Sequence, residues 1–266
     1  MRYILRRKAE AVSMNKMTVV TRNRETYFMK RLTEEVRELE YWNPWEDERL
    51  PDTESFLVRT TGVYGDDRDL ELLRKSQRNI INPTSSHELL RDKTKQFSYL
   101  EKKGFHVIPW KALDSRGEFL PEKILIKPIR GQGGWGIRTM DQTSFLQWEK
   151  ETTDRSWIIQ PYLENVKEFR LFYCGDEEIL LERSGGVAAN FTQGGSAKIV
   201  SIPTGLSEFG EEIRMITGTF YGAIDFFEMS SGEQLILEIN PVPGIEQLEK
   251  LSGQNIIRKV ISLFKG

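Results

Sequence analysis

The sequence predicts a mixed α/β and α+β protein with one small α/β lobe followed by two α+β lobes. The first observation is that strand-like and helix-like segments alternate between about residues 17 and 81, in the order β-α-β-α-β. The second is a change after Gly104, where strand-like segments follow one another at short intervals with fewer helices between them. Alternating elements are typical of a parallel sheet, and closely spaced strands are typical of antiparallel sheets.

The first lobe is predicted over residues 17–84. It starts with the apolar strand MTVVT at 17–21, and apolar residues at helical spacing predict a helix over 25–39. Two more strands flank a further helix, and the first 16 residues are predicted to be a flexible leader. The remaining elements of this lobe are a strand at 55–59, a helix near 68–77 and a strand at 79–81.

A long helix is predicted from residue 85 to 103, ending at Gly104, because glycine favours the C-terminus of helices. It opens the central lobe, residues 85–156, and the C-terminal lobe follows over 157–266. Strands are predicted near 107–110, 123–127, 136–140, 157–160, 168–174, 178–183, 197–201, 221–228 and 234–240, and helices near 143–152, 205–216, 245–251 and 254–264.

Composition excludes several classes of protein. Lys and Arg number 38 against 40 Asp and Glu, so the chain has no overall basic charge to attract nucleic acid or acidic lipid. Apolar runs of about five residues are far shorter than the roughly 20 of a membrane helix. One cysteine and two histidines leave no disulfide and almost no material for a zinc site. The single thiol and the absence of an export signal predict a cytoplasmic protein.

A glycine-rich segment, KILIKPIRGQGGWGIRTM, occupies residues 123–140. Its glycines match the dinucleotide-binding spacing, but a strand-like run follows them where that motif requires a helix. The segment therefore predicts a hairpin whose backbone N–H groups surround phosphate oxygens, with Lys127 on the strand before it. A plain surface hairpin is the alternative.

Lys93 lies on the predicted 85–103 helix, where Leu89, Lys93 and Phe97 share one face. A lysine on an apolar face either extends its ammonium group to solvent or has an anionic partner. The residues alone leave both interpretations open.

The strongest chemical pattern is GAIDFFEMSSGEQLILEINPVPG, residues 222–244. A two-residue loop at Ser231-Gly232 would place Asp225 opposite Glu238, with Asn240 on the same face as Glu238. Carboxylates that face each other among apolar neighbours need a cation. Oxygen ligands without His or Cys indicate Mg²⁺ or Mn²⁺, and a solvated polar hairpin is the alternative.

Two arginines, Arg170 and Arg183, lie on consecutive predicted strands. Each can bind a carboxylate or phosphate through two parallel hydrogen bonds. A surface position at a strand end explains them equally well.

Taken in order, these segments resemble the ATP-grasp superfamily, and within it the RimK-like carboxylate–amine ligases. The resemblance covers about residues 17–264. It is carried by the helix at 82–104, the K-P-x-x-G-x-G-G-x-G-I segment, and the D…E-I-N-P-V-P-G-I-E terminus. It implies an ATP-grasp fold in which a short pre-ATP-grasp lobe precedes two lobes that clamp the nucleotide.

The resemblance also implies roles for individual residues, ATP as substrate and Mg²⁺ or Mn²⁺ as cofactor. Arg170, Arg183 and Lys127 would be catalytic, and Asn190 and Arg59 would contact the acceptor substrate. Asp225, Glu238 and Asn240 would bind the metal. The nucleotide would be bound by Lys93, Lys127, Gly131, Gln132, Gly133, Gly134, Trp135, Gln160, Pro161, Tyr162, Leu163 and Glu168.

The implied reaction joins a carboxylate to an amine through an acylphosphate and releases ADP and phosphate. An amino acid such as glutamate would be added to a peptide, a protein tail or a metabolite. The chain departs from the family pattern at Pro161, where Glu is usual, and at Ala188-Ala189-Asn190, where an Arg is missing. A kinase of the same fold and a nucleotide-binding module without turnover remain alternatives, and assembly as a homo-oligomer is left open.

Overall fold

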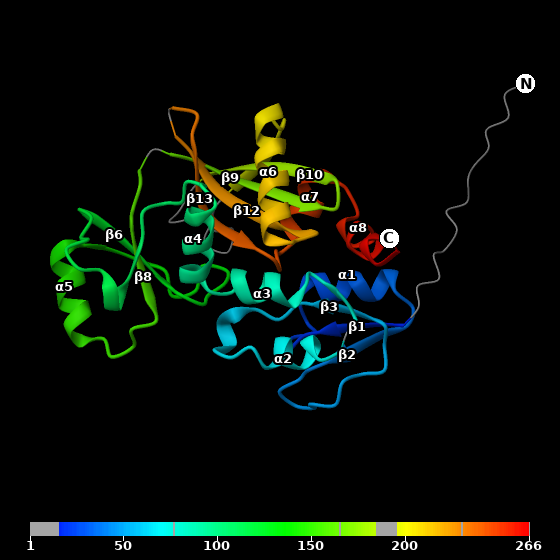
Figure 1. Ribbon diagram of the computed structural model, residues 1–266. Coiled ribbons are helices and arrows are strands. Elements are labelled where there is room, and N and C mark those ends of the chain that lie inside the picture. The colour runs from blue at the N-terminus through cyan, green and yellow to red at the C-terminus, as the bar shows by residue number, and fades with distance from the viewer. Residues whose placement is uncertain (1–15, 77, 165, 185–195, 230, 266) are drawn as a thin grey trace, which may run out of the picture.

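The computed structural model describes residues 16–76, 78–164, 166–184, 196–229 and 231–265. They form three sheets with helices packed around them (Figure 1). Within these residues, no helix is both long enough and apolar enough to cross a membrane. The predicted mixed α/β and α+β class is confirmed, and among the described strands one sheet is parallel and two are antiparallel.

The N-terminal sheet is fully parallel, with strand order β2-β1-β3-β4. The helix predicted over 25–39 is shorter and ends at Glu35, where Val36 is extended and donates its N–H to the carbonyl of Leu32. The chain then forms a strand, β2, that the sequence did not predict. Pairing with the central strand of the sheet outweighs the helical spacing of Leu39. The elements are β1 (Met17–Val20), α1 (Tyr27–Glu35), β2 (Leu39–Trp42), β3 (Ser55–Val58), α2 (Arg68–Arg74) and β4 (Asn79–Ile81).

The predicted helix over 85–103 is two helices, α3 (Thr84–Leu90) and α4 (Lys93–Lys102). Asp92 interrupts it, because its backbone is extended and its carboxylate accepts hydrogen bonds from the N–H groups of Thr94 and Lys95. The apolar residues Phe97 and Leu100 of α4 belong to the hydrophobic cluster of the C-terminal sheet.

The central lobe contains an antiparallel sheet with order β5-β8-β6-β7. Strand β8 pairs with β6, so Trp157–Pro161 belong to the central sheet, although the C-terminal lobe was predicted to begin at residue 157. The predicted strand at 107–110 does not form, and this segment makes an isolated bridge between Val107 and Ile236. The elements are β5 (Lys111–Ala112), β6 (Lys123–Pro128), β7 (Arg138–Asp141), α5 (Gln142–Glu151) and β8 (Trp157–Pro161).

The C-terminal sheet is antiparallel and has the order β11-β10-β9-β12-β13. One face packs against α4 and α6, and α7 and α8 follow the last strand (Figure 1). The elements are β9 (Lys167–Cys174), β10 (Glu177–Ser184), β11 (Ser196–Val200), α6 (Thr204–Thr217), β12 (Tyr221–Glu228), β13 (Gln234–Asn240), α7 (Glu246–Ser252) and α8 (Ile256–Ser262).

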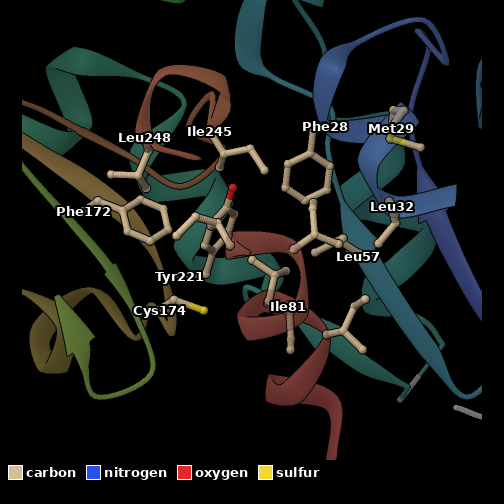
Figure 2. Close-up of a cluster of buried hydrophobic side chains, with 14 of the residues drawn as sticks. Phe28, Met29, Leu32, Leu57, Ile81, Phe172, Cys174, Tyr221, Ile245 and Leu248 are labelled. Carbon is tan, nitrogen blue, oxygen red and sulfur yellow. The ribbon is translucent and has the colours of Figure 1, made fainter. Parts of the chain in front are cut away.

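The N-terminal and C-terminal lobes share one hydrophobic core. Phe28 and Leu32 of α1 belong to the same buried cluster as Phe172 and Tyr221 of the C-terminal sheet (Figure 2). Ile257 of α8 is part of this cluster too. The central lobe has a separate cluster around Ile124, Phe145 and Ile159. Burial of apolar surface therefore joins the first and last parts of the chain into one body.

Candidate active site

A cleft of about 780 Å³ is lined by the N-terminal lobe, the glycine-rich loop, the C-terminal sheet and the segment that leads into α7. It collects most of the side chains that the sequence singles out. Those that line it are Arg59, Lys127, Gln132, Gly133, Gly134, Trp135, Glu168, Arg170, Arg183, Asp225, Glu238 and Asn240. Asn190 lies outside the described residues.

Asp225 lies directly opposite Glu238, so that pairing prediction is confirmed. The predicted register of the hairpin is wrong, however, because Glu228 pairs with Gln234 nearer the turn. Three steps along β12 therefore correspond to four along β13, and the surplus residue is a bulge at Leu237. The register near the turn differs by one residue from the predicted register, and the extra residue in the bulge restores it. Asp225 and Glu238 therefore still lie opposite each other.

Two arginines bind carboxylates inside the cleft. Arg170 donates two hydrogen bonds to Asp225, with Nε–Oδ1 at 2.6 Å and Nη2–Oδ2 at 2.5 Å. Arg183 Nη1 lies 2.7 Å from Glu168 Oε1 and 3.6 Å from Asp225 Oδ1. Burial acts to raise the pKa of Asp225, but the charge and hydrogen bonds of Arg170 outweigh it and lower that pKa. Burial prevails at Glu168 and raises its pKa.

Lys127, on β6, is 5% exposed and has no carboxylate within ion-pair distance among the described residues. Burial lowers the pKa of its ammonium group, although Glu238 acts in the opposite direction. A buried cation without a direct partner is unfavourable on its own, so this position favours an anionic ligand.

Lys93 is also buried, and its anionic neighbour is Glu238, with Nζ 3.6 Å from Oε1. The prediction that Lys93 and Leu89 share one helix face is wrong, because Leu89 lies in α3 and Lys93 is the first residue of α4. Its Nζ donates to the carbonyl of Gly131, and its backbone N–H donates to Ile129 O at 3.1 Å. Lys93 therefore does not line the cleft, and its two hydrogen bonds fix the start of the glycine-rich loop.

The glycine-rich loop connects β6 to β7, as predicted, and is not followed by a helix. Gly136 has a φ of +79°, and a Cβ there would lie 2.8 Å from a carbon of the Pro128 ring. Gln132 fixes the other end of the loop by donating to Val242 O at 3.1 Å. Trp135 is 84% exposed at the rim of the cleft.

The four residues Gln160, Pro161, Tyr162 and Leu163 do not line this cleft. Gln160 is fully buried, and both polar atoms of its amide lack a partner in the described structure. An unsatisfied buried amide is costly. A polar ligand that reached this strand end would satisfy it.

The charges at the inner end of the cleft sum to a small positive value. Three cationic and three acidic side chains line it, namely Lys127, Arg170 and Arg183 with Glu168, Asp225 and Glu238, and Lys93, which lies outside the cleft 3.6 Å from Glu238, adds the fourth positive charge. In the described part of the chain, no three His, Cys, Asp or Glu side chains form a group that would bind a metal alone. One or two carboxylates suit Mg²⁺, which completes its coordination with water and substrate phosphates.

Sequence reasoning missed two contributors. Asp67, in the loop after β3, accepts two hydrogen bonds from Arg130 and one from Arg91. It thereby ties the N-terminal lobe to the residue before the glycine-rich loop. Tyr27, at the start of α1, lines the cleft and donates to Glu249. Arg130, the partner of Asp67, could have been noticed as the charged residue directly before the glycines. Nothing in the sequence indicated Tyr27.

Comparison with known sequences gives a family match. The model of the RimK-like ATP-grasp domain matches residues 111–264. A probable alpha-L-glutamate ligase of Pasteurella multocida is 25% identical over 198 residues, which cover 68% of this chain and 62% of that protein. The alpha-aminoadipate–LysW ligase LysX of Sulfurisphaera tokodaii is 25% identical over 244 residues, or 83% of this chain and 85% of LysX. The matched region thus spans about six-tenths of the glutamate-ligase relative.

Solved structures with the same fold include a RimK-domain ATP-grasp protein of Sphaerobacter thermophilus, with a TM-score of 0.71 and 14% identity over 93% of this chain and 98% of that one. The D-cycloserine synthetase DcsG gives a TM-score of 0.71 and 15% identity, covering 94% of this chain and 98% of that one. At these identities the likeness shows the fold.

Proposed function

The chain belongs to the RimK-like ATP-grasp family, and from this premise we propose that it is an ATP-dependent ligase that joins a carboxylate to an amine. The observation that carries the proposal is the convergence of Asp225, Glu238 and Lys127, which has no ion pair among the described residues, in one cleft beside the glycine-rich loop. A net positive site with oxygen ligands suits a nucleotide triphosphate bound with divalent cations.

The nucleotide phosphates would lie between the glycine-rich loop and Lys127. Backbone N–H groups of that loop donate to phosphate oxygens, and Lys127 supplies the positive charge that its own surroundings leave uncompensated. The adenine would be bound near the buried amide of Gln160 and the carbonyl of Pro161. Proline retains that acceptor and lacks an N–H donor.

Mg²⁺ or Mn²⁺ would be held by Glu238, Asn240 and Asp225. The fit rests on the donor set, since hard oxygens from two adjacent strands face the same cleft. Asp225 has both oxygens in hydrogen bonds with Arg170, which fix its orientation and leave a lone pair on each. When bound, the cation neutralises phosphate charge.

The chain's own part in the reaction is positioning and electrostatics. A substrate carboxylate oxygen attacks the γ-phosphorus, ADP leaves, and the amine then attacks the acyl carbon and displaces phosphate. Arg170 and Arg183 offset negative charge on the transferring group from the sheet side, and Lys127 does so from the loop side. No side-chain nucleophile is required, because the substrate's own carboxylate is activated.

The added amine would be an amino acid such as glutamate, and the acceptor a peptide, protein tail or metabolite. Support for this finer statement comes from the names of relatives, which include glutamate ligases and a ligase for the protein LysW.

The test is Mg-ATP turnover by the purified chain, following ADP and free phosphate while pools of amino acids and short acidic peptides are added or omitted. Equal release of ADP and phosphate that depends on an amino acid supports ligation. ADP without free phosphate indicates a kinase. Nucleotide binding without turnover in any pool contradicts ligation to short peptides and favours a nucleotide-binding module without turnover.

Two variants locate the activity. Lys127→Ala and Glu238→Ala should each abolish ADP formation and leave the fold intact. Lys123→Ala is the matched control, because Lys123 lies on the same strand, is exposed and pairs with Glu164 outside the cleft. Near-normal turnover in either of the first two variants contradicts the site.

A further inference from the structure

The cleft has an apolar part that the proposed chemistry does not use. Among the exposed large apolar side chains of the described residues, Trp135 and Val63 line the cleft and the others do not. Trp135 is 84% exposed and Val63 is 47% exposed. They belong to different lobes, since Trp135 lies on the glycine-rich loop and Val63 lies on a short turn, Gly62–Tyr64, after β3. Exposed apolar groups that line a cleft from two sides are typical of a binding site.

The backbone around Trp135 is fixed without help from its indole ring. Gly133 and Gly134 have φ of +65° and +77°, and the Trp135 N–H donates to Gln132 O at 3.4 Å. Gln132 is in turn bound to Val242 O. The indole makes no hydrogen bond and no ring or cation contact with a described residue. The loop therefore presents a large apolar surface that is mostly unpacked.

Val63 is held on the opposite wall by the packing of its turn against α3. A Cβ on Gly62 would lie 2.8 Å from the carbonyl oxygen of Arg91, so the turn lies directly on the end of that helix. Gly65, with a φ of +81°, closes the turn by donating its N–H to Gly62 O at 3.3 Å. The backbone of Val63 is thus fixed, while its side chain stays half exposed at the cleft.

The reaction indicates which molecule meets these two residues. The carboxylate that is activated must lie at the γ-phosphate, which the glycine-rich loop covers in the proposed function. The rest of that molecule then extends along the loop toward Trp135. Apolar lining continues inward, because Ile137 at the end of the loop and Leu237 directly before Glu238 also line the cleft.

The N-terminal wall of the cleft offers little to an acidic side chain. Apart from Arg59, its described lining residues are uncharged, among them Thr26, Thr61 and Val63. An acidic group there would lose hydration with few cations to compensate it. An apolar group would instead remove its own surface, and that of Trp135, from water.

We propose that Trp135 and Val63 bind an apolar side chain of the acceptor, so that the carboxylate this protein activates belongs to an apolar acid rather than to an acidic one. A peptide that ends in leucine or methionine and a free apolar acid share this chemistry. The inference rests on the proposed function and adds the polarity of the acceptor to it.

Equilibrium calorimetry tests the site without turnover. N-acetyl amino acids are titrated into the full chain with Mg²⁺ and a non-hydrolysable ATP analogue, because acetylation blocks the amine and leaves the carboxylate. N-acetyl-leucine and N-acetyl-methionine should bind about 10-fold more tightly than N-acetyl-asparagine and N-acetyl-glutamine, which have nearly the same shapes. N-acetyl-glutamate should bind no more tightly than N-acetyl-glutamine. Tripeptides that end in the same residues distinguish a peptide acceptor from a free acid.

Four variants locate the preference. Val63→Thr keeps the side-chain shape and replaces a methyl group with a hydroxyl, so it should reduce the preference about 3-fold. Trp135→Ser should abolish the preference, and Trp135→Phe should retain most of it. Ile199→Thr is the matched control, because Ile199 is an exposed apolar residue of β11 that does not line the cleft, and it should keep the full preference. A wild-type melting temperature shows that each variant is folded.

Trp135 also reports its own contacts. It is the exposed one among the six tryptophans, all of which are described, so acrylamide quenches its fluorescence preferentially. The apolar acids should protect it beyond any protection by the ATP analogue, and Trp135→Phe should lose this signal. Full protection by the analogue alone makes Trp135 a nucleotide contact and overturns the proposal. So does an apolar acid that binds no more tightly than its polar counterpart, or a wild-type preference in Trp135→Ser.

Phosphate release with the same acids, and a mixture of amino acids as amines, separates this inference from the proposed function. Equal release with apolar and polar acids supports ligation and refutes the apolar site. A Trp135-dependent binding preference without phosphate release supports the apolar site and contradicts ligation of these acids.

Discussion

Glu249 joins the first helix to the last and provides a direct test of how the two lobes are held together. It is 8% exposed and accepts hydrogen bonds from Tyr27 Oη at 2.8 Å and Arg31 Nε at 2.9 Å. The same carboxylate accepts from the backbone N–H groups of Ile256 and Ile257, at the start of α8. Glu249→Ala would leave all four donors without this acceptor.

The magnitude follows from the partners. A hydrogen bond to a charged group contributes about 1.5–3 kcal/mol and a neutral one about 1 kcal/mol, and unpaired buried donors add their desolvation cost. Water reaches Arg31, whose side chain is 24% exposed, and Glu34 remains beside it, so part of the loss is recovered. We expect Glu249→Ala to lower the free energy of unfolding by about 3 kcal/mol, measured by urea denaturation at pH 7.

The pH dependence gives a second readout. Burial acts to raise the pKa of Glu249, but the hydrogen bonds from Arg31, Tyr27 and the α8 backbone outweigh it, so the folded pKa lies below the ordinary value. The stabilisation is therefore fully present above the ordinary Glu pKa of about 4.3 and is lost as pH falls through the lower folded pKa. The difference between wild type and Glu249→Gln should shrink over that interval.

Glu246→Gln is the control for this experiment, since it is the same substitution on the same helix at an exposed pair with Lys250. It should change stability by less than about 0.5 kcal/mol. A Glu249 effect as small as that of Glu246, or one that is constant from pH 7 to pH 3, would refute the reasoning.

Three further outcomes are expected. Lys127→Met should raise the melting temperature by a few °C while ADP formation is lost, because it removes a buried charge that has no ion pair in the described part of the chain; a lower melting temperature contradicts this. Asp67→Asn should weaken ATP binding about 5- to 10-fold in a nucleotide titration, because Arg130 loses its bidentate partner; unchanged affinity removes Asp67 from the loop's support. Gly136→Ala should weaken ATP binding about 10-fold, because an alanine there has a left-handed backbone and its Cβ meets the Pro128 ring. Gly232→Ala is the control, since Gly232 has a φ of +84° and no neighbour near its Cβ, and it should leave ATP binding unchanged. Equal effects of the two variants would show that loop geometry is not the cause.

The sequence predicted the elements whose periodicity and boundaries are local. Strands β12 and β13 were recognisable as two apolar runs on either side of a short polar, glycine-containing turn. The pairing of Asp225 with Glu238 was predicted from a two-residue loop at Ser231-Gly232, and it holds because the bulge at Leu237 offsets the different register near the turn.

Features that depend on distant contacts were not predictable. The break at Asp92 arises from a capping carboxylate inside an otherwise helical pattern. Strand β2 forms because β1 lies beside it, although its first residue continues a helical stripe. The support of Arg59 by Tyr221 joins residues 162 positions apart, and nothing near either residue indicates the contact.

The bulge in β13 has a consequence for how such a cleft diversifies. Adjacent residues of a regular strand face opposite sides, yet Leu237 and Glu238 both line the cleft. Leu237 has no cross-strand partner in the ladder, so its side chain is free of the register that fixes Asp225 against Glu238. A substitution at position 237 can therefore change the shape of the cleft, and with it the ligand that fits, without changing the pairing of Asp225 with Glu238.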